Sequence, residues 1–454
     1  MSRPYPLRIL FFLGLLAGSL HADDPKDGQG SGFFQTALIS GRWVLVDPDG
    51  RPFFCTGLSY VSYQGYTIKG SQTAPYTDAI AKKYGSRDHW AQATVEKMLD
   101  WGFNTLGAWS DNDLAKRDVG GKHLAYTAIL DLGAGFVAQK GGQAWLNGIF
   151  PDVFDPHFAS YCRAGALKLC LRLKDDPRLL GWFIDNELRW QPDLRSPEEL
   201  LVSFLNLPPH EPGREAAFGL LRKRYPDIAR FNSVWGTSFP SWREARLGKK
   251  FVAPRGADRK SASSVNANGA AFFSDCDAFA GLLADKYFYE TRAAIKSADP
   301  HHLILGCRFA NVPADRVVAA AGKWMDVISF NCYQSDPTSE LKGYDPPNKP
   351  LLISEFSFRG RDSGCPNTKG AGPVVATQQD RAAGFERYVR AALADPHLVG
   401  YQWFELADEP KQGRFDGENS NNGVVDINDN TYVVLVDKMT ELDHQAQQVY
   451  QPQK

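Results

Sequence analysis

The sequence predicts an α/β protein whose fold is a (β/α)8 TIM barrel. Eight short apolar segments, rich in β-branched and aromatic residues, are spread along the 454 residues, which is typical of buried parallel strands. Helical patterns fall between most of them, and such alternation favours a parallel sheet wrapped by helices. The expected strands are residues 53–58, 104–108, 128–132, 180–185, 303–307, 327–331, 351–354 and 398–403.

An open, doubly wound sheet is the alternative arrangement for the same alternation of elements. Proteins with that sheet commonly bind nucleotides through a glycine-rich loop that follows a strand. No GxGxxG or Walker-type loop follows any of the expected strands. The closed barrel is therefore the favoured fold.

Local signals predict further elements outside the barrel strands. Residues 43–46 and 52–54 flank Asp47-Pro48-Asp49-Gly50, a turn sequence that indicates a β-hairpin. Thr377 with Asp380 resembles a capping box at the start of a helix. The helices expected from their apolar spacing are residues 157–174, 272–298, 377–393 and 431–450.

The N-terminal residues have the composition of a secretory signal peptide. Arg3 and Arg8 precede a short apolar stretch over residues 9–17, and Ala22 is a small residue suited to the cleavage site. The stretch is too short for a comfortable membrane span, and an uncleaved anchor is the alternative. We therefore expect a signal peptide over residues 1–22, a linker over 23–34, a single barrel domain over 35–454, and a secreted or periplasmic protein.

Three connections are longer than a minimal barrel needs. They follow the fourth, seventh and eighth strands, at residues 189–271, 359–376 and 406–431. All three lie at the carboxyl ends of strands, where the loops of a (β/α)8 barrel form the substrate site. The first of them, which has helices of its own, could instead mediate contacts between subunits.

Charge and cysteine content exclude several classes of partner. The formal net charge is −1, so no basic surface for nucleic acid or anionic membrane is expected. The seven cysteines are dispersed and form no CxxC pair, which argues against a zinc site. Asp426, Asn428 and Asn430 begin like a calcium loop, but Thr431 stands where that loop needs glycine. No metal or cofactor is therefore expected.

Two of the expected strands end on a glutamate. Glu187 follows Asp185 and Asn186 after the fourth strand, and Glu355 ends the seventh. Because the carboxyl ends of parallel barrel strands open on one face, the two carboxylates should face one substrate, as in a glycoside hydrolase. An ion pair at the barrel rim is the alternative for each of them.

The neighbours of these glutamates suggest different roles. A general acid needs surroundings that disfavour its charge, and Trp182, Phe183 and Trp190 could form apolar walls near Glu187. Asn186 could bind a sugar hydroxyl. An attacking carboxylate must be ionised, and Arg308 and Tyr333, at the ends of the fifth and sixth strands, could support the charge of Glu355.

Other candidates for sugar binding lie at the ends of the second and eighth strands and in the last long loop. Trp403 could form an aromatic floor, and Trp109 could stack on a sugar or pack in the core. Glu405 could hold a hydroxyl or be structural. Glu418 lies in a polar loop over residues 416–423, which could line a subsite or be a plain turn.

These motifs resemble those of a known group. Asn186-Glu187 on the fourth strand with Glu355 on the seventh is similar to the retaining (β/α)8 glycoside hydrolases, and the resemblance implies Glu187 as acid/base and Glu355 as nucleophile. Segments 150–156, 181–188, 353–356, 413–419 and 423–426 resemble the β-agarase family, and 224–239 resembles related β-galactosidases. The resemblance implies a substrate that is a β-linked, galactose-containing polysaccharide or oligosaccharide.

The chain departs from the agarase pattern in two places. Residues 357–362, which follow Glu355, contain no histidine where the resemblance leads us to expect one. The residues before the first strand are also too few for an N-terminal carbohydrate-binding domain, which favours a shorter, exo-acting or oligosaccharide-specific relative. The alternatives are a β-galactosidase, a mannanase- or cellulase-like hydrolase, and a barrel that binds glycans without cleaving them.

Overall fold

The computed structural model describes residues 30–248, 250–257, 259 and 267–449. The expected signal peptide, most of the expected linker and the end of the last predicted helix lie outside these residues. Within them, no helix has the length and apolar character needed to cross a membrane.

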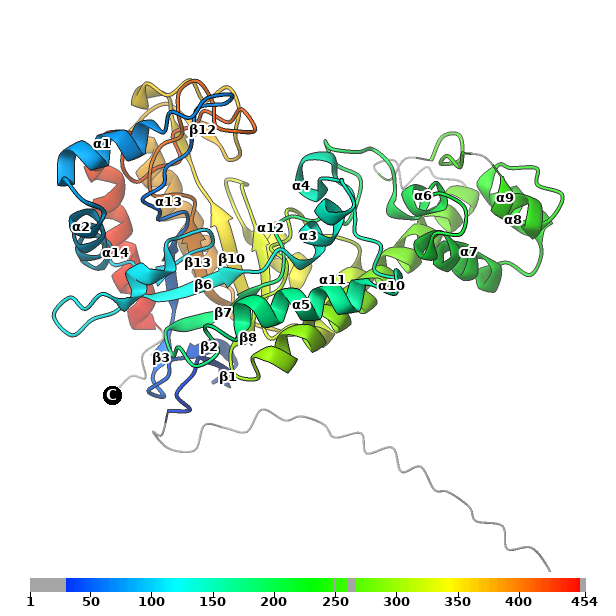
Figure 1. Ribbon diagram of the computed structural model, residues 1–454, viewed down its shortest axis with the longest axis horizontal. Coiled ribbons are helices and arrows are strands. Elements are labelled where there is room, and N and C mark those ends of the chain that lie inside the picture. Colours follow the sequence, from blue (N-terminus) through cyan, green and yellow to red (C-terminus); the bar gives the residue numbers. More distant parts are fainter. Residues whose placement is uncertain (1–29, 249, 258, 260–266, 450–454) are drawn as a thin grey trace, which may run out of the picture.

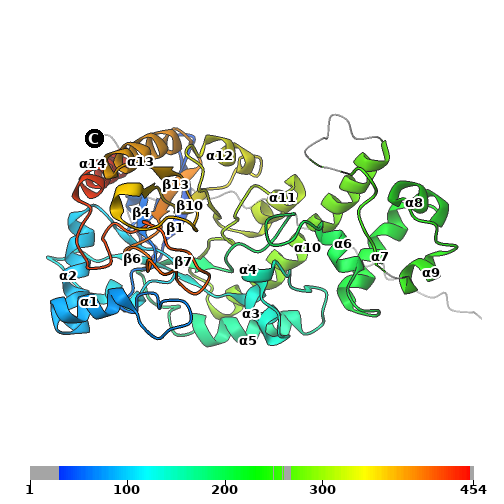
Figure 2. The ribbon, with the colours of Figure 1, turned by 90° about the horizontal axis from the view of Figure 1, so that it is seen from above.

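The core is a closed barrel of eight parallel strands (Figures 1 and 2). Hydrogen bonds join them in the order β8-β7-β6-β5-β4-β13-β10-β9, and a parallel bridge between Phe309 and Phe330 joins the two ends. The predicted (β/α)8 fold is therefore confirmed. The strands are β4 (Cys55–Leu58), β5 (Thr105–Leu106), β6 (Ala125–Ile129), β7 (Leu179–Phe183), β8 (Leu303–Ile304), β9 (Ile328–Asn331), β10 (Leu351–Phe356) and β13 (Leu398–Trp403).

The third barrel strand, β6, begins three residues earlier than predicted. The apolar run continues past its end, which concealed the boundary. Asp131 has a left-handed backbone (φ 51°) immediately before α3 (Leu132–Gln139), so residues 130 and 131 form a sharp turn and Leu132 begins the helix.

A small antiparallel sheet covers the amino-terminal end of the barrel. It consists of β1 (Gln35–Ile39), β2 (Arg42–Val46) and β3 (Pro52–Phe53), and β2–β3 is the predicted hairpin. Buried apolar side chains of this sheet and of the barrel strands pack into one cluster, which closes this end: Phe34, Leu45, Cys55, Leu180, Leu303, Leu352 and Val399.

Helices surround the barrel in Figure 2. The predicted capping box of α13 is present, because Thr377 and Asp380 each accept a hydrogen bond from the other's backbone N–H. The helices around the sheet are α1 (Pro75–Tyr84), α2 (Arg87–Asp100), α5 (Phe158–Cys170), α10 (Ala267–Ala298), α11 (Asp315–Trp324), α12 (Thr338–Tyr344), α13 (Gln378–Leu393) and α14 (Val433–Val449).

The long connection after β7 forms a lobe that extends away from the barrel (Figure 1). Aromatic side chains build its core, where Trp235 packs on Phe231 and Phe272. Asp227 and Ser241 cap two of its helices. The lobe contains α6 (Leu200–Leu205), α7 (Pro212–Arg224), α8 (Ile228–Trp235), α9 (Trp242–Leu247) and the first part of α10.

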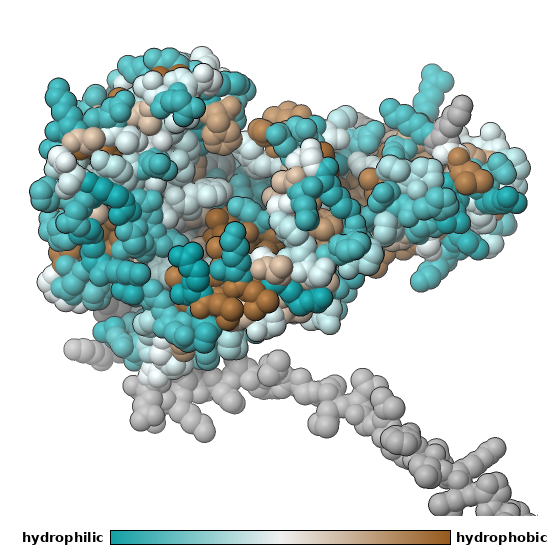
Figure 3. Space-filling model, viewed as in Figure 1, coloured by the Kyte–Doolittle hydropathy of each residue, from teal (hydrophilic) through white to brown (hydrophobic). Residues whose placement is uncertain are grey.

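The other connections carry short elements. The face of the molecule drawn in Figure 3 is largely hydrophilic. The loop after β6 holds α4 (Ala144–Asn147), and the loop after β10 holds β11 (Arg359–Gly360), which pairs with β12 (Val374–Val375). Figure 3 shows an apolar patch over α5, where Leu167 and Leu171 are exposed.

Candidate active site

A cavity of about 810 Å³ opens at the carboxyl ends of the barrel strands. Predicted site residues line it together with aromatic side chains from several loops. Its lining includes Trp109, Asn186, Glu187, Tyr333, Glu355 and Glu418, and also Tyr60, Tyr66, Trp145, Phe404, Arg414 and Phe415. Among the described residues of the lobe after β7, none lines this cavity. The lobe therefore does not form its wall.

At the ends of several strands, a sharp backbone turn sets the direction of the side chain. Trp109, Glu187 and Arg308 have φ angles of 60°, 50° and 50°. A left-handed conformation costs about 1–2 kcal/mol for a residue with a Cβ, so surrounding contacts must hold each of these turns. One such contact joins two of the turns directly, because the Glu187 backbone N–H donates to the Arg308 carbonyl at 3.2 Å.

Glu187 is half-buried, and both of its carboxylate oxygens accept N–H donors. Asn331 Nδ2 donates to Oε1 at 2.9 Å, and Trp145 Nε1 donates to Oε2 at 3.1 Å. Asn331 also donates to the side-chain oxygen of the adjacent Asn186 at 3.2 Å. The carboxylate is thus fixed in orientation from two sides of the cavity.

Glu355 is buried and faces a cation and a phenol. Arg308 Nη2 donates to its Oε1 at 2.5 Å, and the Tyr333 hydroxyl donates to Oε2 at 2.8 Å. Burial nevertheless raises the pKa of Glu355 to about 7, and the charge of Glu187 acts in the same direction, whereas Arg308 and Tyr333 lower it. Burial therefore outweighs the two stabilising contacts.

Arg308 lies beneath the cavity and does not line it. Its guanidinium sits 4.4 Å from the ring centre of Trp109 and 5.0 Å from that of Phe183. Its Nε and Nη1 find no hydrogen-bond partner among the described residues, and cation–π contact with the two rings takes the place of such bonds. Trp109 thus serves both as cavity wall and as cover for this cation.

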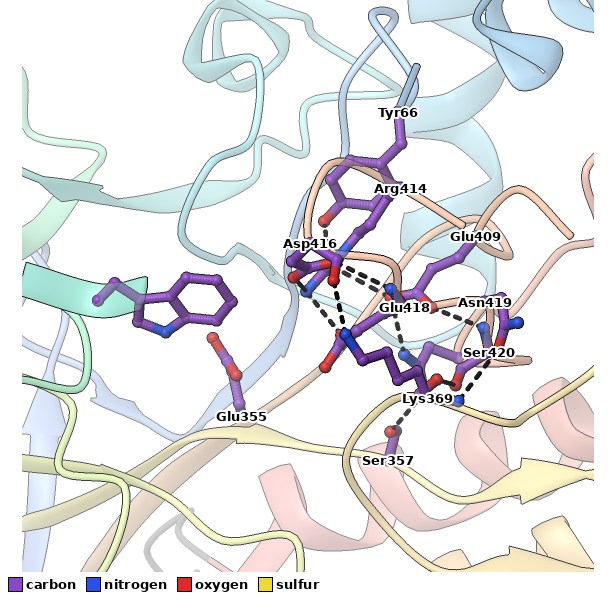
Figure 4. Close-up of polar contacts among 12 residues, drawn as sticks. Tyr66, Glu355, Ser357, Lys369, Glu409, Arg414, Asp416, Glu418, Asn419 and Ser420 are labelled. Atoms are coloured by element: carbon purple, nitrogen blue, oxygen red, sulfur yellow. Dashed lines mark hydrogen bonds and ion pairs between the residues drawn. The ribbon is translucent and has the colours of Figure 1, made fainter. Parts of the chain in front are cut away.

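A cluster of carboxylates surrounds Arg414 in the loop after β13 (Figure 4). The guanidinium donates to the Tyr66 hydroxyl at 2.8 Å and to Glu418 at 2.7 Å, and it also contacts Asp416 and Glu409. Burial raises the pKa of Glu409 to about 8 and raises that of Glu418, against the effect of Arg414. The cluster places one cation and one half-buried carboxylate, Glu418, at the cavity wall.

Besides Arg308, two further predicted binding residues, Trp403 and Glu405, lie outside the cavity lining. Trp403 is fully buried and points toward α13, where it packs on Phe385, so the expected aromatic floor is wrong. The next residue, Phe404, lines the cavity instead. Glu405 is also fully buried, and burial together with Glu409 raises its pKa well above the usual range. Of the two roles that the sequence left open for Glu405, this position favours the structural one.

Sequence reasoning missed Trp145, Asn331, Arg414 and Tyr66. Asn331 carried a usable signal, because it is a polar residue at the end of an apolar strand, as Glu187 and Glu355 are. Tyr66 and Arg414 lie in loops and Trp145 in the four-residue helix α4, where no periodic pattern points to the cavity.

One group among the described residues has side chains spaced as metal ligands. Asp345, Asp395 and His397 bring ligand atoms within 4.8 Å of one another. They precede β10 and β13 and therefore lie at the opposite end of the barrel from the cavity.

The fold and the cavity together define a class: a (β/α)8 barrel with glutamates at two strand ends has the architecture of a glycoside hydrolase. The β-galactosidase model of glycoside hydrolase family 42 matches residues 152–358, which include both glutamates. The chain is 31% identical to β-agarase B of Vibrio sp. (strain JT0107), over 92% of this chain and 48% of that protein. β-Agarase A of the same strain is 30% identical, over 89% and 44%.

Solved structures of agarases are also similar to this chain. An exo-β-agarase structure has a TM-score of 0.76 and 26% identity, covering 92% of this chain and 66% of that one. An agarase structure has a TM-score of 0.75 and 27% identity, covering 93% and 66%. The chain spans about half the length of the curated relatives it matches. The predicted resemblance to β-agarases and β-galactosidases is confirmed.

Proposed function

We propose that this protein is a retaining glycoside hydrolase that cleaves β-linkages in a galactose-containing polysaccharide or oligosaccharide. The observation that carries the proposal is the position of Glu187 and Glu355 in one cavity with different partners, N–H donors for the first and an arginine and a phenol for the second. Similarity to proteins named β-agarases supports a galactan as substrate.

In the first step, a Glu355 carboxylate oxygen attacks the anomeric carbon of the bound sugar. The bond from that carbon to the glycosidic oxygen breaks, and the proton of Glu187 passes to this oxygen, so the leaving sugar departs as an alcohol. The products of the step are a glycosyl ester on Glu355 and an ionised Glu187. Arg308 and Tyr333 keep the attacking oxygens aimed through the two hydrogen bonds described above.

In the second step, water replaces the leaving sugar. Ionised Glu187 takes one proton from the water, whose oxygen attacks the anomeric carbon and releases the Glu355 carboxylate. Two inversions give a product with the configuration of the substrate, and Glu187 ends the cycle protonated. Neither step requires a metal ion or a cofactor.

Cavity residues next to the two glutamates would bind the sugar. Asn186 and Glu418 present polar atoms to the cavity, and Trp109 presents a ring whose other face covers Arg308. Aromatic rings pack on the C–H faces of sugars, while amides and carboxylates bind the hydroxyls and so select among them.

The proposal includes the organisation and location of the protein. We propose residues 35–454 as a single catalytic domain that follows a cleaved signal peptide over residues 1–22 and a linker over 23–34. The composition of the first 22 residues supports export to the periplasm or the medium.

A β-galactosidase is the second candidate, because the family model that covers both glutamates carries that description. A screen of substrates separates the candidates. The chain without residues 1–22 is incubated with oligosaccharides from agarose, β-galactan and β-mannan and with a simple aryl β-galactoside, and the products are separated by chromatography. We expect cleavage of the agarose or galactan oligosaccharides. Cleavage of the aryl galactoside alone would favour the β-galactosidase, and cleavage of mannan alone would contradict a galactan substrate.

Variants test the roles of the two glutamates. Glu355→Gly should lower hydrolysis by about 10³-fold or more, and azide should restore part of the activity by occupying the space of the lost carboxylate. Glu386→Gln, which removes a half-buried carboxylate that pairs with Arg390 on α13 and does not line the cavity, is the matched control and should leave the rate unchanged. Full activity of Glu355→Gly would exclude Glu355 as nucleophile. Binding without hydrolysis in the wild type would favour a glycan-binding barrel.

A further inference from the structure

Trp145 donates one of the two side-chain hydrogen bonds to Glu187, neither of which was predicted from the sequence. Its indole N–H donates to Oε2, while Asn331 occupies Oε1 from the opposite side. Asn331 is itself fixed, because it is buried on β9 and its side-chain oxygen accepts a hydrogen bond from Ser354 at 2.7 Å. Without the indole, the Glu187 carboxylate would keep one anchor and could rotate about it.

Hydrogen bonds from two arginine side chains hold Trp145 in position. One guanidinium nitrogen of Arg195 donates to the backbone carbonyls of both Trp145 and Glu187, at 3.2 and 2.8 Å. Arg189 Nε donates to the carbonyl of Gly148, which ends the short helix α4, at 2.8 Å. Two arginines from the loop after β7 therefore attach α4 to the strand end that carries Glu187, so the indole contact does not depend on a freely moving loop.

The Trp145 ring also forms part of an apolar wall at the cavity mouth, together with Phe415. Its centre lies 6.1 Å from that of Phe415, which belongs to the loop after β13. Both rings line the cavity, and Phe415 is 57% exposed. A large aromatic surface left open beside polar groups is characteristic of a binding site.

We infer that Trp145 positions the carboxylate of Glu187 for proton transfer and, with Phe415, receives the sugar that leaves. The inference rests on the proposed function and assigns a subsite within it. As Glu187 gives up its proton, negative charge develops on its oxygens, and the indole N–H is already aimed at one of them. A preorganised donor of this kind stabilises the transition state more than the ground state.

The test uses two substrates that differ in their need for an acid. An agarose-derived tetrasaccharide has a poor leaving group that must be protonated, whereas the dinitrophenolate of 2,4-dinitrophenyl β-galactoside leaves without protonation. Trp145→Phe keeps a ring and removes the donor. Its kcat/KM should fall about 10- to 100-fold for the tetrasaccharide and stay within about threefold of the wild type for the aryl galactoside. Leu146→Ala, which removes an exposed neighbour on α4, is the matched control and should change neither value.

Two results would overturn the positioning role. An equal loss of kcat/KM for both substrates would indicate general damage to the site, and an unchanged value for the tetrasaccharide would show that the donor is not used. The binding role of the apolar wall is tested by Phe415→Ala, which should raise KM for the tetrasaccharide about tenfold with little change in kcat. An unchanged KM would exclude a role of the wall in binding the leaving sugar.

Binding separates this inference from the proposed function. Calorimetry with Glu355→Gln measures tetrasaccharide affinity in the absence of turnover, and adding Phe415→Ala should weaken it about tenfold. A wild type that cleaves neither substrate contradicts the proposed function. In that case, tetrasaccharide binding that the Phe415→Ala change weakens would still support the wall, and binding that it leaves unchanged would exclude it.

Discussion

Arg308 and Glu355 form a buried ion pair at the base of the cavity, with Nη2 and Oε1 2.5 Å apart and both side chains almost inaccessible to solvent. The arginine has no other carboxylate partner among the described residues, and its remaining surface lies against Trp109 and Phe183. Among the described residues, Glu355 is therefore the carboxylate that the charge of Arg308 stabilises by direct contact. This pair explains how a deeply buried carboxylate can still be ionised near neutral pH.

The pair predicts the acid side of the pH profile. Burial raises the pKa of Glu355 to about 7, and the ionised form is the one that attacks. The active form is therefore present above that pH and is lost as pH falls, so kcat/KM should drop about tenfold per unit below pH 7. Arg308→Met removes the cation that lowers the pKa and should move this limb to higher pH by about one unit or more. A flat profile down to pH 5 in the wild type would contradict the assignment.

Glu418 and Glu405 should differ in their effect on binding, although both are carboxylates of the same loop region. Glu418 lines the cavity and accepts a hydrogen bond from Arg414, so Glu418→Gln should raise KM about tenfold. Glu405 is buried outside the lining, where burial and the nearby Glu409 raise its pKa, so Glu405→Gln should change kcat/KM less than about threefold. Equal losses in the two variants would show that Glu405 contacts the substrate.

Asp443 predicts a pH-dependent stability unrelated to the cavity. It is buried on α14, accepts a hydrogen bond from Tyr401 on β13, and burial raises its pKa well above the usual range. Its contribution to stability is therefore complete below the unfolded pKa of about 3.9 and is lost as pH rises through the folded pKa. Asp443→Asn is neutral at every pH and should melt about 2 °C or more above the wild type at pH 8.

The same two proteins should melt closer together at pH 4, where Asp443 is largely protonated in the folded wild type. Activity is the internal control, because Asp443 lies outside the cavity lining. A melting difference that does not change with pH would show that packing, and not ionisation, causes it.

The strand ends of the barrel were predictable because apolar runs stop on polar residues there. Glu187 and Glu355 were found in this way, and Asn331 obeys the same pattern. Trp403 was misplaced because both faces of a barrel strand are buried, so hydrophobicity does not tell inside from outside. In β13 the Gln402 side chain approaches Gly57 of the neighbouring strand, whereas Trp403 faces α13.

The loop residues of the cavity could not be predicted from local sequence. Trp145 reaches Glu187 because Arg195, fifty residues away, holds its carbonyl. Arg414 reaches the cavity through contacts with Tyr66 from the other end of the chain. Such positions depend on the assembled fold, and no propensity of the local segment specifies them.

The central claim, that Glu355 attacks while Glu187 donates and then accepts a proton, is tested most directly by the configuration of the first product. Proton NMR of a reaction with an agarose-derived β-linked oligosaccharide, recorded before mutarotation, shows which anomer appears first. The account predicts the β-anomer, because two successive displacements restore the starting configuration. Initial formation of the α-anomer would mean a single displacement by water and would contradict the assignment of Glu355 as nucleophile.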